Sequence, residues 1–451
     1  MRITTTFFSG LIFILAATSA YAQVDLSAKE RGLALTLSPL PALPASPGNR
    51  YADNADAARF GQRLFFDPRL SKNGAIACFT CHQPDLGWSD GKTTAVGLET
   101  LNKHSPSLLH SGHQRWFFWN GRADSLWAQV QYPLEHPAEM GYTRSSLVRL
   151  LASDFRLGHE YRAIFGNLPD GANDPARFPD RARPPLPEAP GPFTVAPTPE
   201  QLAAKDDDFK AWFGMQAEDQ KAANLVLANC AKAIAAYERL LVTGPSRFDQ
   251  FVASLREPEN SVAANADASV DAPSSILSDA EIRGYQLFAG KAGCINCHFS
   301  PMLSGGEFHN IGLEVATGLP FDSGRPDGIK TVRIDPMNGR GEFSDARDWE
   351  QNVKIRYLAY NKHTFGSYKT PTLRNVASSA PYMHDGRFST IREVLEFYRD
   401  LPGMPPVGHR EETLLPVAFT EEEMLDLEAF LHSLTGTPLE KALTEAPVDK
   451  N

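Results

Sequence analysis

The chain has 451 residues, of which 42% are hydrophobic and 22% are charged. This length and composition are typical of a globular protein of two or three domains that buries substantial cores. The formal net charge of -10 excludes the basic surface that nucleic-acid binding requires, and no run of like charges forms a tail.

The N-terminal segment 1–22 has the layout of a secretory signal peptide. A positive charge at Arg2 precedes an apolar stretch around 7–17, and small residues lead up to Ala22. An uncleaved membrane anchor is the alternative, but the apolar stretch is shorter than the roughly 20 residues that span a bilayer. We therefore expect cleavage after Ala22, export to the periplasm and no stable insertion into the membrane.

Helical patterns recur along the rest of the chain. Amphipathic helices are expected at 55–66 and 278–288, and a long apolar helix at 222–241. The unpaired Cys230 lies in this apolar helix, where we expect a buried structural thiol and assign no function. Capping boxes, which mark the starts of helices, occur at three positions: Ser278 with Glu281, Thr390 with Glu393, and Thr420 with Glu423.

Four of the five cysteines fall into two Cys-x-x-Cys-His patterns, at 78–82 and 294–298. This is the spacing of c-type haem attachment, in which both thiols form thioethers with the porphyrin and the adjacent imidazole ligates the iron. The cysteine pairs of a zinc ribbon, the alternative, lie only about 15 to 20 residues apart. We therefore predict two covalently bound c-type haems, held by Cys78, Cys81, His82, Cys294, Cys297 and His298.

Composition also suggests how the chain is divided. The proline-dense stretch 169–199 offers little to pack and is interpreted as a surface insertion, whereas the polar segment 257–275 is interpreted as a linker. Strand patterns are weak throughout. We expect a mainly α fold with long loops, made of two cytochrome c-like haem domains at 23–256 and 276–440, with a tail at 441–451.

Several further motifs lie in a fixed order around the two haem motifs: 64–71 (LFFDPRLS), 87–91 (GWSDG), 105–108 (SPSL), 118–122 (FWNGR), 133–141, 371–375 (PTLRN) and 381–386 (PYMHDG). Together they resemble the bacterial di-haem cytochrome c peroxidases and their relative MauG, from about residue 54 to residue 434. The resemblance implies an enzyme in which the N-terminal haem reacts with hydrogen peroxide and the C-terminal haem stores or relays electrons.

The sixth ligand of each iron distinguishes subgroups of this family. Where peroxidases that need reductive activation carry a removable histidine, this chain has Leu98. The resemblance therefore implies an open site at the first haem, unless His104, His110 or His113 takes the histidine's place.

At the second haem, the ordinary peroxidases supply a methionine where this chain, like MauG, has a tyrosine, Tyr398. An anionic oxygen ligand lowers the potential of the iron and favours storage of an oxidising equivalent. The resemblance implies that Tyr398 is the sixth ligand, and Met302 and Met404 are the alternatives.

The resemblance also assigns residues to the first haem pocket. Glu139 matches the glutamate that moves a proton during O–O cleavage, with an exposed loop carboxylate as the alternative, and Gln129 and Pro133 match the pocket residues that precede it. Trp119 matches the tryptophan between the haems, where it relays electrons, although packing alone would also explain it. His384 lies in the inter-haem loop, in a structural or a catalytic role.

Two family features are altered in this chain. The family carries a calcium ion between the haems, for which Ser379 and Pro381 would supply backbone carbonyls, but His104 replaces the asparagine ligand. Imidazole is a poor ligand for a hard cation, so calcium is expected only if water or another carbonyl fills the place. MauG also has a tryptophan that leads to the surface before its second motif, where this chain has Ala292.

Leu98 and Tyr398 favour a MauG-like enzyme that oxidises a partner protein, and segment 318–348 also looks like relatives associated with copper-acquisition proteins. The alternative is a cytochrome c peroxidase that removes hydrogen peroxide with electrons from a small cytochrome or copper protein. A non-catalytic di-haem electron carrier is a further alternative, against which Glu139 and Gln129 argue. Oxygen-dependent cleavage of a hydrocarbon is more remote.

Overall fold

The computed structural model describes residues 24–187, 197–256, 276–314, 322–346 and 353–448. The predicted signal peptide and the predicted linker lie outside the described residues. The helices are α1 (Ala28–Leu37), α2 (Ala55–Phe65), α3 (Cys78–Cys81), α4 (Gln131–Glu135), α5 (Arg144–Ser153), α6 (Phe155–Phe165), α7 (Pro199–Ala203), α8 (Asp207–Gly214), α9 (Ala217–Glu238), α10 (Arg247–Ser254), α12 (Asp279–Ala289), α13 (Arg325–Ile334), α14 (Val353–Arg356), α15 (Ile391–Asp400) and α16 (Glu421–Ser433).

Short 3-10 turns connect these helices: η1 (Pro68–Leu70), η2 (Pro84–Leu86), η3 (Ser111–His113), η4 (Ala128–Val130), η5 (Cys294–Asn296), η6 (Lys362–Thr364), η7 (Val376–Ser378) and η8 (Lys441–Leu443). The described sheet has two short antiparallel strands, β1 (Phe308–His309) and β2 (Tyr368–Lys369), in which His309 pairs with Tyr368. The prediction of a mainly α fold with long loops is confirmed.

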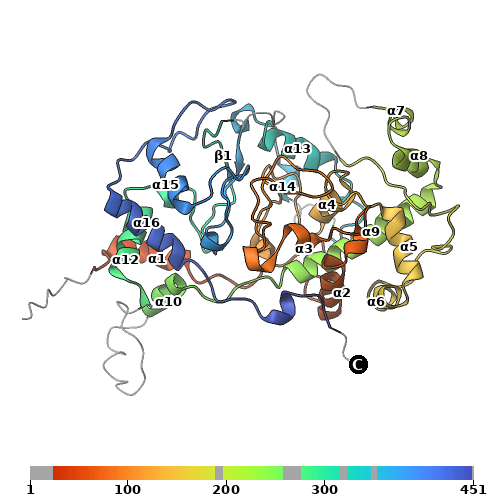
Figure 1. The fold of residues 1–451 in the computed structure, drawn as a ribbon, viewed down its shortest axis with the longest axis horizontal. Helices are drawn as coiled ribbons and strands as arrows, with labels where there is room; N and C mark the ends of the chain where they lie inside the picture. Colours follow the sequence, from red (N-terminus) through yellow and green to blue (C-terminus); the bar gives the residue numbers. More distant parts are fainter. Residues whose placement is uncertain (1–23, 188–196, 257–275, 315–321, 347–352, 449–451) are drawn as a thin grey trace, which may run out of the picture.

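The first core is built on the pair of helices α2 and α9 (Figure 1). Asn54 caps α2 by accepting a hydrogen bond from the N–H of Ala57 at 2.8 Å. Gly61 lets the helices approach closely, because a Cβ there would lie 1.9 Å from the carbonyl oxygen of Ala233. The apolar helix begins earlier than expected and ends at Glu238, and the predicted burial of Cys230 is confirmed at 2% exposure.

The second core repeats this arrangement with α12 and α16. Gly284 occupies in α12 the place of Gly61 in α2, since a Cβ there would lie 1.9 Å from the carbonyl oxygen of Asp426. The three predicted capping boxes are present at the starts of α12, α15 and α16. Both haem motifs therefore follow a helix whose glycine is pressed against a second helix, as expected of two related modules.

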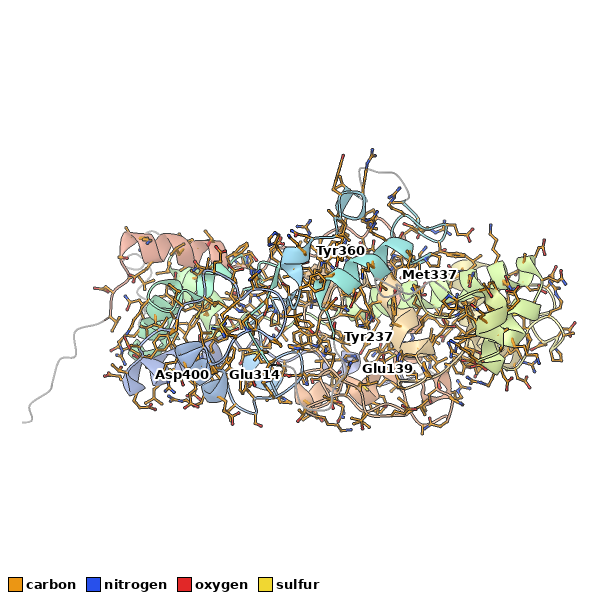
Figure 2. The ribbon with its side chains drawn as sticks, turned by 90° about the horizontal axis from the view of Figure 1, so that it is seen from above. Glu139, Tyr237, Glu314, Met337, Tyr360 and Asp400 are labelled. Atoms are coloured by element: carbon orange, nitrogen blue, oxygen red, sulfur yellow. The ribbon has the colours of Figure 1, made fainter. Side chains whose placement is uncertain are left out.

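The two cores cross the domain boundaries expected from the sequence. Helices α1 and α10, expected in the first domain, pack in the second core through Leu37 and Phe251. Met337 and Phe343, expected in the second domain, pack in the first core, and Figure 2 shows Met337 in the half of the molecule that holds Tyr237. Long-range packing, and not composition, therefore decides which core each helix joins.

The proline-dense stretch 169–199 also differs from expectation. Within its described part, Phe178 and Ala182 are fully buried in the first core. Arg177 forms an ion pair with Asp219 of α9 at 2.6 Å. The described part of this stretch, residues 169–187, therefore packs against α5 and α9 although it forms no helix or strand. Its many prolines made it look like an unpacked surface insertion.

Among the described residues, no helix combines the length and the apolar character that crossing a bilayer requires.

Candidate functional site

A cavity of about 600 Å³ lies beside the first Cys-x-x-Cys-His motif, and this volume is typical of enclosed ligand sites. Residues between 369 and 383 line it together with residues between 70 and 140, so both parts of the chain contribute. It brings together nine predicted site residues: Cys78, Cys81, His82, Trp119, Gln129, Pro133, Glu139, Ser379 and Pro381. The second motif, His384 and Tyr398 are not among its walls.

The two motif histidines are held in the same way. Nδ1 of His82 lies 3.1 Å from the carbonyl oxygen of Trp88, and Nδ1 of His298 lies 3.0 Å from that of Leu303. A carbonyl accepts only from a protonated Nδ1, so Nε2 is left as the free lone pair that an iron requires. Burial lowers the pKa of both imidazoles, that of His298 to about 4, which keeps them neutral.

The carbonyl partners of these histidines share an unusual backbone. Trp88 has φ of 62° and Leu303 has φ of 48°, both in the left-handed region. This conformation costs a residue with a side chain about 1–3 kcal/mol, so it persists only where the surrounding structure holds it. Both residues are buried in their cores at 2% exposure or less, so packing holds each carbonyl toward its histidine.

The motif cysteines lie on short helical turns, Cys78 and Cys81 on α3 and Cys294 and Cys297 on or next to η5, and none of the four forms a disulfide. Paired thiols, a neutral imidazole with a free Nε2 and an adjoining cavity fit a c-type haem at the first motif. The second motif repeats the thiols and the imidazole geometry.

Glu139 is held at the cavity by a backbone pairing with the segment that contains Leu98. The N–H of Leu98 donates to the carbonyl of Glu139, and the N–H of Glu99 donates to that of Ala138, both at 2.9 Å. Gly97 is required here, because a Cβ would lie 2.6 Å from Cα of Glu139. Leu98 therefore belongs to the structure that positions this carboxyl.

The carboxyl of Glu139 is mostly buried, with 21% of its side chain exposed. Burial raises its pKa, and the positive charge of Arg122 opposes the rise. The imidazole Nδ1 of His136 lies 3.9 Å away, beyond hydrogen-bond range. A carboxyl of raised pKa in a cavity suits proton transfer.

Glu238 is a site residue that the sequence analysis missed. It ends α9, is 3% exposed and lines the same cavity, where Nε2 of Gln129 lies 3.4 Å from its carboxylate. Burial raises its pKa from 4.5 to about 8. The sequence feature that could have indicated this residue was an acidic side chain at the end of an apolar helix. Ordinary helix termini show the same feature, so it did not single out Glu238.

Trp119 is anchored to both parts of the chain. Its indole N–H donates to the carbonyl of His104 at 2.9 Å, and its own carbonyl accepts from the N–H of Lys369 at 2.8 Å. The ring of His384 lies edge-on to it with a centroid separation of 6.5 Å, and burial lowers the pKa of that imidazole to about 4. Trp119 and His384 thus form one packed unit.

The three histidines considered as substitute ligands have other contacts. Nδ1 of His104 lies 2.9 Å from the carbonyl of Lys92, and its Nε2 lies 3.3 Å from the hydroxyl of Ser89. His110 and His113 are not among the cavity walls. These contacts support the expectation of an open side at the first haem.

Tyr398 lies on α15 and packs against Leu313, Phe397 and Leu401. Burial raises the pKa of its hydroxyl, and the neighbouring Cys294 and Cys297 raise it further. The tyrosine hydroxyl is therefore close to both anchoring thiols of the second motif.

The alternative ligand Met404 is 81% exposed and lies away from the packed surroundings of that motif. Met302 is partly buried five residues after Cys297, and the hydroxyl of Thr372 bonds to its backbone carbonyl. Tyr398 is partly buried on α15, where Cys294 and Cys297 are among the groups that raise the pKa of its hydroxyl.

Calcium stays a prediction. Ser379 and Pro381 line the cavity as expected, but the imidazole of His104 is bonded to Lys92 and Ser89. Within the described ranges, no group of three or more His, Cys, Asp or Glu side chains could hold a metal ion.

Comparison with known proteins supplies the family. A family model described as di-haem cytochrome c peroxidase matches residues 55–181. The methylamine utilization protein MauG of Methylorubrum extorquens is 30% identical over 86% of this chain and 80% of its own length. The chain belongs to the di-haem cytochrome c peroxidase and MauG family. Cytochrome-c peroxidase IdrP1 of Denitromonas iodatirespirans is also 30% identical, over 89% of this chain and 86% of its own.

Solved structures agree on the fold. A MauG-like protein associated with microbial copper homeostasis superposes with a TM-score of 0.56 and 22% identity, covering 90% of this chain and 97% of its own. The diheme peroxidase BthA of Burkholderia thailandensis superposes with a TM-score of 0.54 and 19% identity, and the match covers 88% of this chain and 91% of BthA. As a member of the di-haem peroxidase and MauG family, the chain is a haem oxidoreductase that carries two c-type haems.

Proposed function

We propose that this family member is an exported, periplasmic enzyme of the MauG-like kind, which uses hydrogen peroxide to oxidise a partner protein. The observation that carries the proposal is the position of Tyr398 on α15, where it packs against the buried cluster of Leu313, Phe397 and Leu401. Cys294 and Cys297 are among the groups that raise the pKa of its hydroxyl. A tyrosine ligand would lower the potential of the second iron and favour storage of an oxidising equivalent there. Leu98, which packs in place of a removable histidine, supports reaction with peroxide without prior reduction.

The residues that would hold the cofactors follow from the two motifs. Cys78 and Cys81 would attach the first haem and His82 would ligate it. At the second site Cys294 and Cys297 would attach the haem, and His298 and Tyr398 would ligate it. When bound, the haems supply redox-active iron for the two-electron reduction of hydrogen peroxide.

The chain's own contribution at the first site is proton transfer. Glu139 would take a proton from the peroxide oxygen nearer the iron and return it to the leaving oxygen. Burial raises the pKa of this carboxyl, which suits a group that must accept a proton and then release it. Gln129 and Pro133 line the same cavity, where Gln129 would donate a hydrogen bond to peroxide and Pro133 would limit the space open to water.

Trp119 would carry electrons between the two sites. Its indole N–H donates to the carbonyl of His104 and its backbone carbonyl accepts from the N–H of Lys369 of β2, so both the ring and the main chain of this residue are held. Residues 23–256 and 276–440 would each supply one haem site, although the cores beneath them share segments.

The test is a pair of spectra of the purified, fully ferric protein, by EPR and by optical absorption, before and after one equivalent of hydrogen peroxide. One high-spin and one low-spin haem, with both signals lost on addition of peroxide, is the expected result. Two low-spin haems that do not respond until one is reduced would contradict the proposal.

A peroxide-removing cytochrome c peroxidase is the second candidate, favoured by the 30% identity to a relative named for that activity. Its electrons would come from a small cytochrome or copper protein that docks transiently. Rapid steady-state turnover of peroxide with a reduced small cytochrome, without modification of a partner protein, would favour it over the MauG-like reaction.

A further inference from the structure

Tyr368 extends the aromatic contact between Trp119 and His384. Its ring stacks on His384 with a centroid separation of 3.8 Å and an interplanar angle of 16°. His384 in turn lies edge-on to Trp119 at 6.5 Å and 65°. The strand β2 fixes this order, because the N–H of Lys369 donates to the carbonyl of Trp119 at 2.8 Å. Three rings therefore form a continuous series that begins at the inter-haem tryptophan.

A proton acceptor lies at the far end of this series. The carboxylate of Asp322 is near enough to the hydroxyl of Tyr368 to raise its pKa. That carboxylate is fixed on both oxygens, since the N–H of Gly324 donates to Oδ1 at 2.7 Å and Nζ of Lys103 lies 3.0 Å from Oδ2. The phenol thus has a fixed base in its surroundings.

The charges around the pair define its protonation. Burial raises the pKa of Asp322, but Lys103 and the N–H of Gly324 outweigh that effect, so the pKa is lowered and the group is ionised near neutral pH. Burial and the nearby Asp322 raise the pKa of Tyr368, so the phenol keeps its proton in the resting protein.

Nζ of Lys103 lies 5.4 Å from the centroid of the Tyr368 ring. A cation at this distance stabilises the electron-rich neutral ring and disfavours a positive charge on it. Oxidation of Tyr368 is therefore unfavourable unless its proton leaves together with the electron, and the nearby carboxylate of Asp322 provides a place for that proton.

We propose that Tyr368 is a redox-active residue that gives one electron through His384 and Trp119 to the peroxide-oxidised haem sites and its phenolic proton to Asp322. The electron leaves the ring, the O–H bond breaks, and a neutral tyrosyl radical remains beside a protonated Asp322. An electron from a donor or a partner protein restores the phenol, and the proton returns. The oxidant is hydrogen peroxide, which takes up two electrons per molecule, so this inference rests on the proposed function.

The position of Tyr368 suits an exit toward a partner. Its side chain is partly exposed, whereas the position before the second motif that carries the exit tryptophan in MauG holds Ala292 in this chain. Tyr357 is more exposed, at 68%, but its ring contact is with Arg356 and it is outside the series. Tyr368 therefore connects the inter-haem unit to solvent.

The experiment uses the holoprotein with both haems, mixed with one equivalent of hydrogen peroxide without donor and frozen at successive times for EPR. Protein grown with ring-deuterated tyrosine identifies a tyrosyl signal by its narrowed hyperfine structure. We expect such a signal in the wild type and in the control Tyr357→Phe, and its loss in Tyr368→Phe. Asp322→Asn, which keeps the ring and removes the base, should lower the radical yield at least several-fold.

Optical spectra of the same samples separate the two proposals. Haems that do not respond to peroxide contradict the proposed function, and with it the oxidant that Tyr368 needs. If the haems of Tyr368→Phe respond to peroxide at the wild-type rate, the radical signal tests Tyr368. A signal that is unchanged in this variant, or absent from every protein, contradicts the role of Tyr368 and leaves the proposed function in place. If Tyr368→Phe alters the resting haem spectra, Asp322→Asn decides, because an undiminished radical in that variant contradicts proton transfer to Asp322.

Discussion

The side-chain nitrogen of Gln129 lies 3.4 Å from the carboxylate of Glu238, and both side chains face the cavity beside the first haem motif. No cation accompanies this carboxylate among the contacts that the structure describes, and burial raises its pKa to about 8. Near neutral pH Glu238 is therefore mostly protonated. The amide nitrogen of Gln129 can donate one hydrogen bond to this carboxyl and keep its second N–H for peroxide.

Glu238→Gln should remove a pH dependence of stability. Because the folded protein binds this proton more tightly than the unfolded chain does, the contribution of Glu238 is fully present below about pH 4.5. It is lost as the pH rises through about 8, at roughly 1.4 kcal/mol for each unit of pKa difference. Denaturant unfolding across this range should show the wild type losing stability relative to Glu238→Gln. Parallel pH profiles for the two proteins would contradict the raised pKa.

Glu139→Gln should slow the reaction with peroxide by roughly a hundredfold or more, the contribution of a general acid–base group. The amide keeps the size of the side chain and loses the transferable proton. Stopped-flow absorption of the ferric protein mixed with peroxide measures the rate.

The neighbouring residue Glu99 provides a control for Glu139. Its N–H pairs with the carbonyl of Ala138 in the same backbone contact, but its side chain is exposed. Glu99→Gln should react at the wild-type rate. Equal rates for Glu139→Gln and Glu99→Gln would remove Glu139 from the proton-transfer step.

The features that depend on local pattern were predictable from the sequence. The capping box of Ser278 and Glu281 starts α12 as expected, because its two hydrogen bonds involve residues three positions apart. The spacing within each haem motif likewise predicted the cofactor. The match of Tyr398 to the MauG pattern picked out a residue that the fold places near Cys294 and Cys297.

The features that depend on distant partners were not predictable. Nothing in the short helix α1 indicates that Leu37 packs in the second core, since that contact forms only when α12 and α16 are in place. Glu238 was missed for the same reason, because its partner Gln129 lies 109 residues earlier in the chain. Phe178 was missed because prolines around it disguised a buried side chain.

Tyr398→Phe should change the EPR signal of the low-spin haem while the first haem still binds peroxide. Removal of the hydroxyl takes away the oxygen ligand, and the ring still fills its place against Phe397 and Leu401. Met404→Leu is the control, because Met404 is 81% exposed and should leave the signal unchanged. An unaltered low-spin signal in Tyr398→Phe would exclude this tyrosine as the ligand.

Gly61→Ala should destabilise the first module and Gly284→Ala the second. In each case the added Cβ would lie 1.9 Å from a backbone carbonyl of the partner helix, so the helices must separate. Overpacking of this kind costs about 1–3 kcal/mol or more, because backbone cannot give way as a side chain can. Denaturant unfolding of the holoprotein, followed by the absorption of each haem, measures the loss.

Gly32→Ala is the matched control for both glycines. Gly32 lies within α1, and a Cβ there would meet nothing within 4 Å. Alanine favours a helix over glycine by roughly 1 kcal/mol, so this variant should be as stable as the wild type or more so. If Gly61→Ala and Gly284→Ala behaved like Gly32→Ala, the close helix crossings before the two haem motifs would not be what holds each module together.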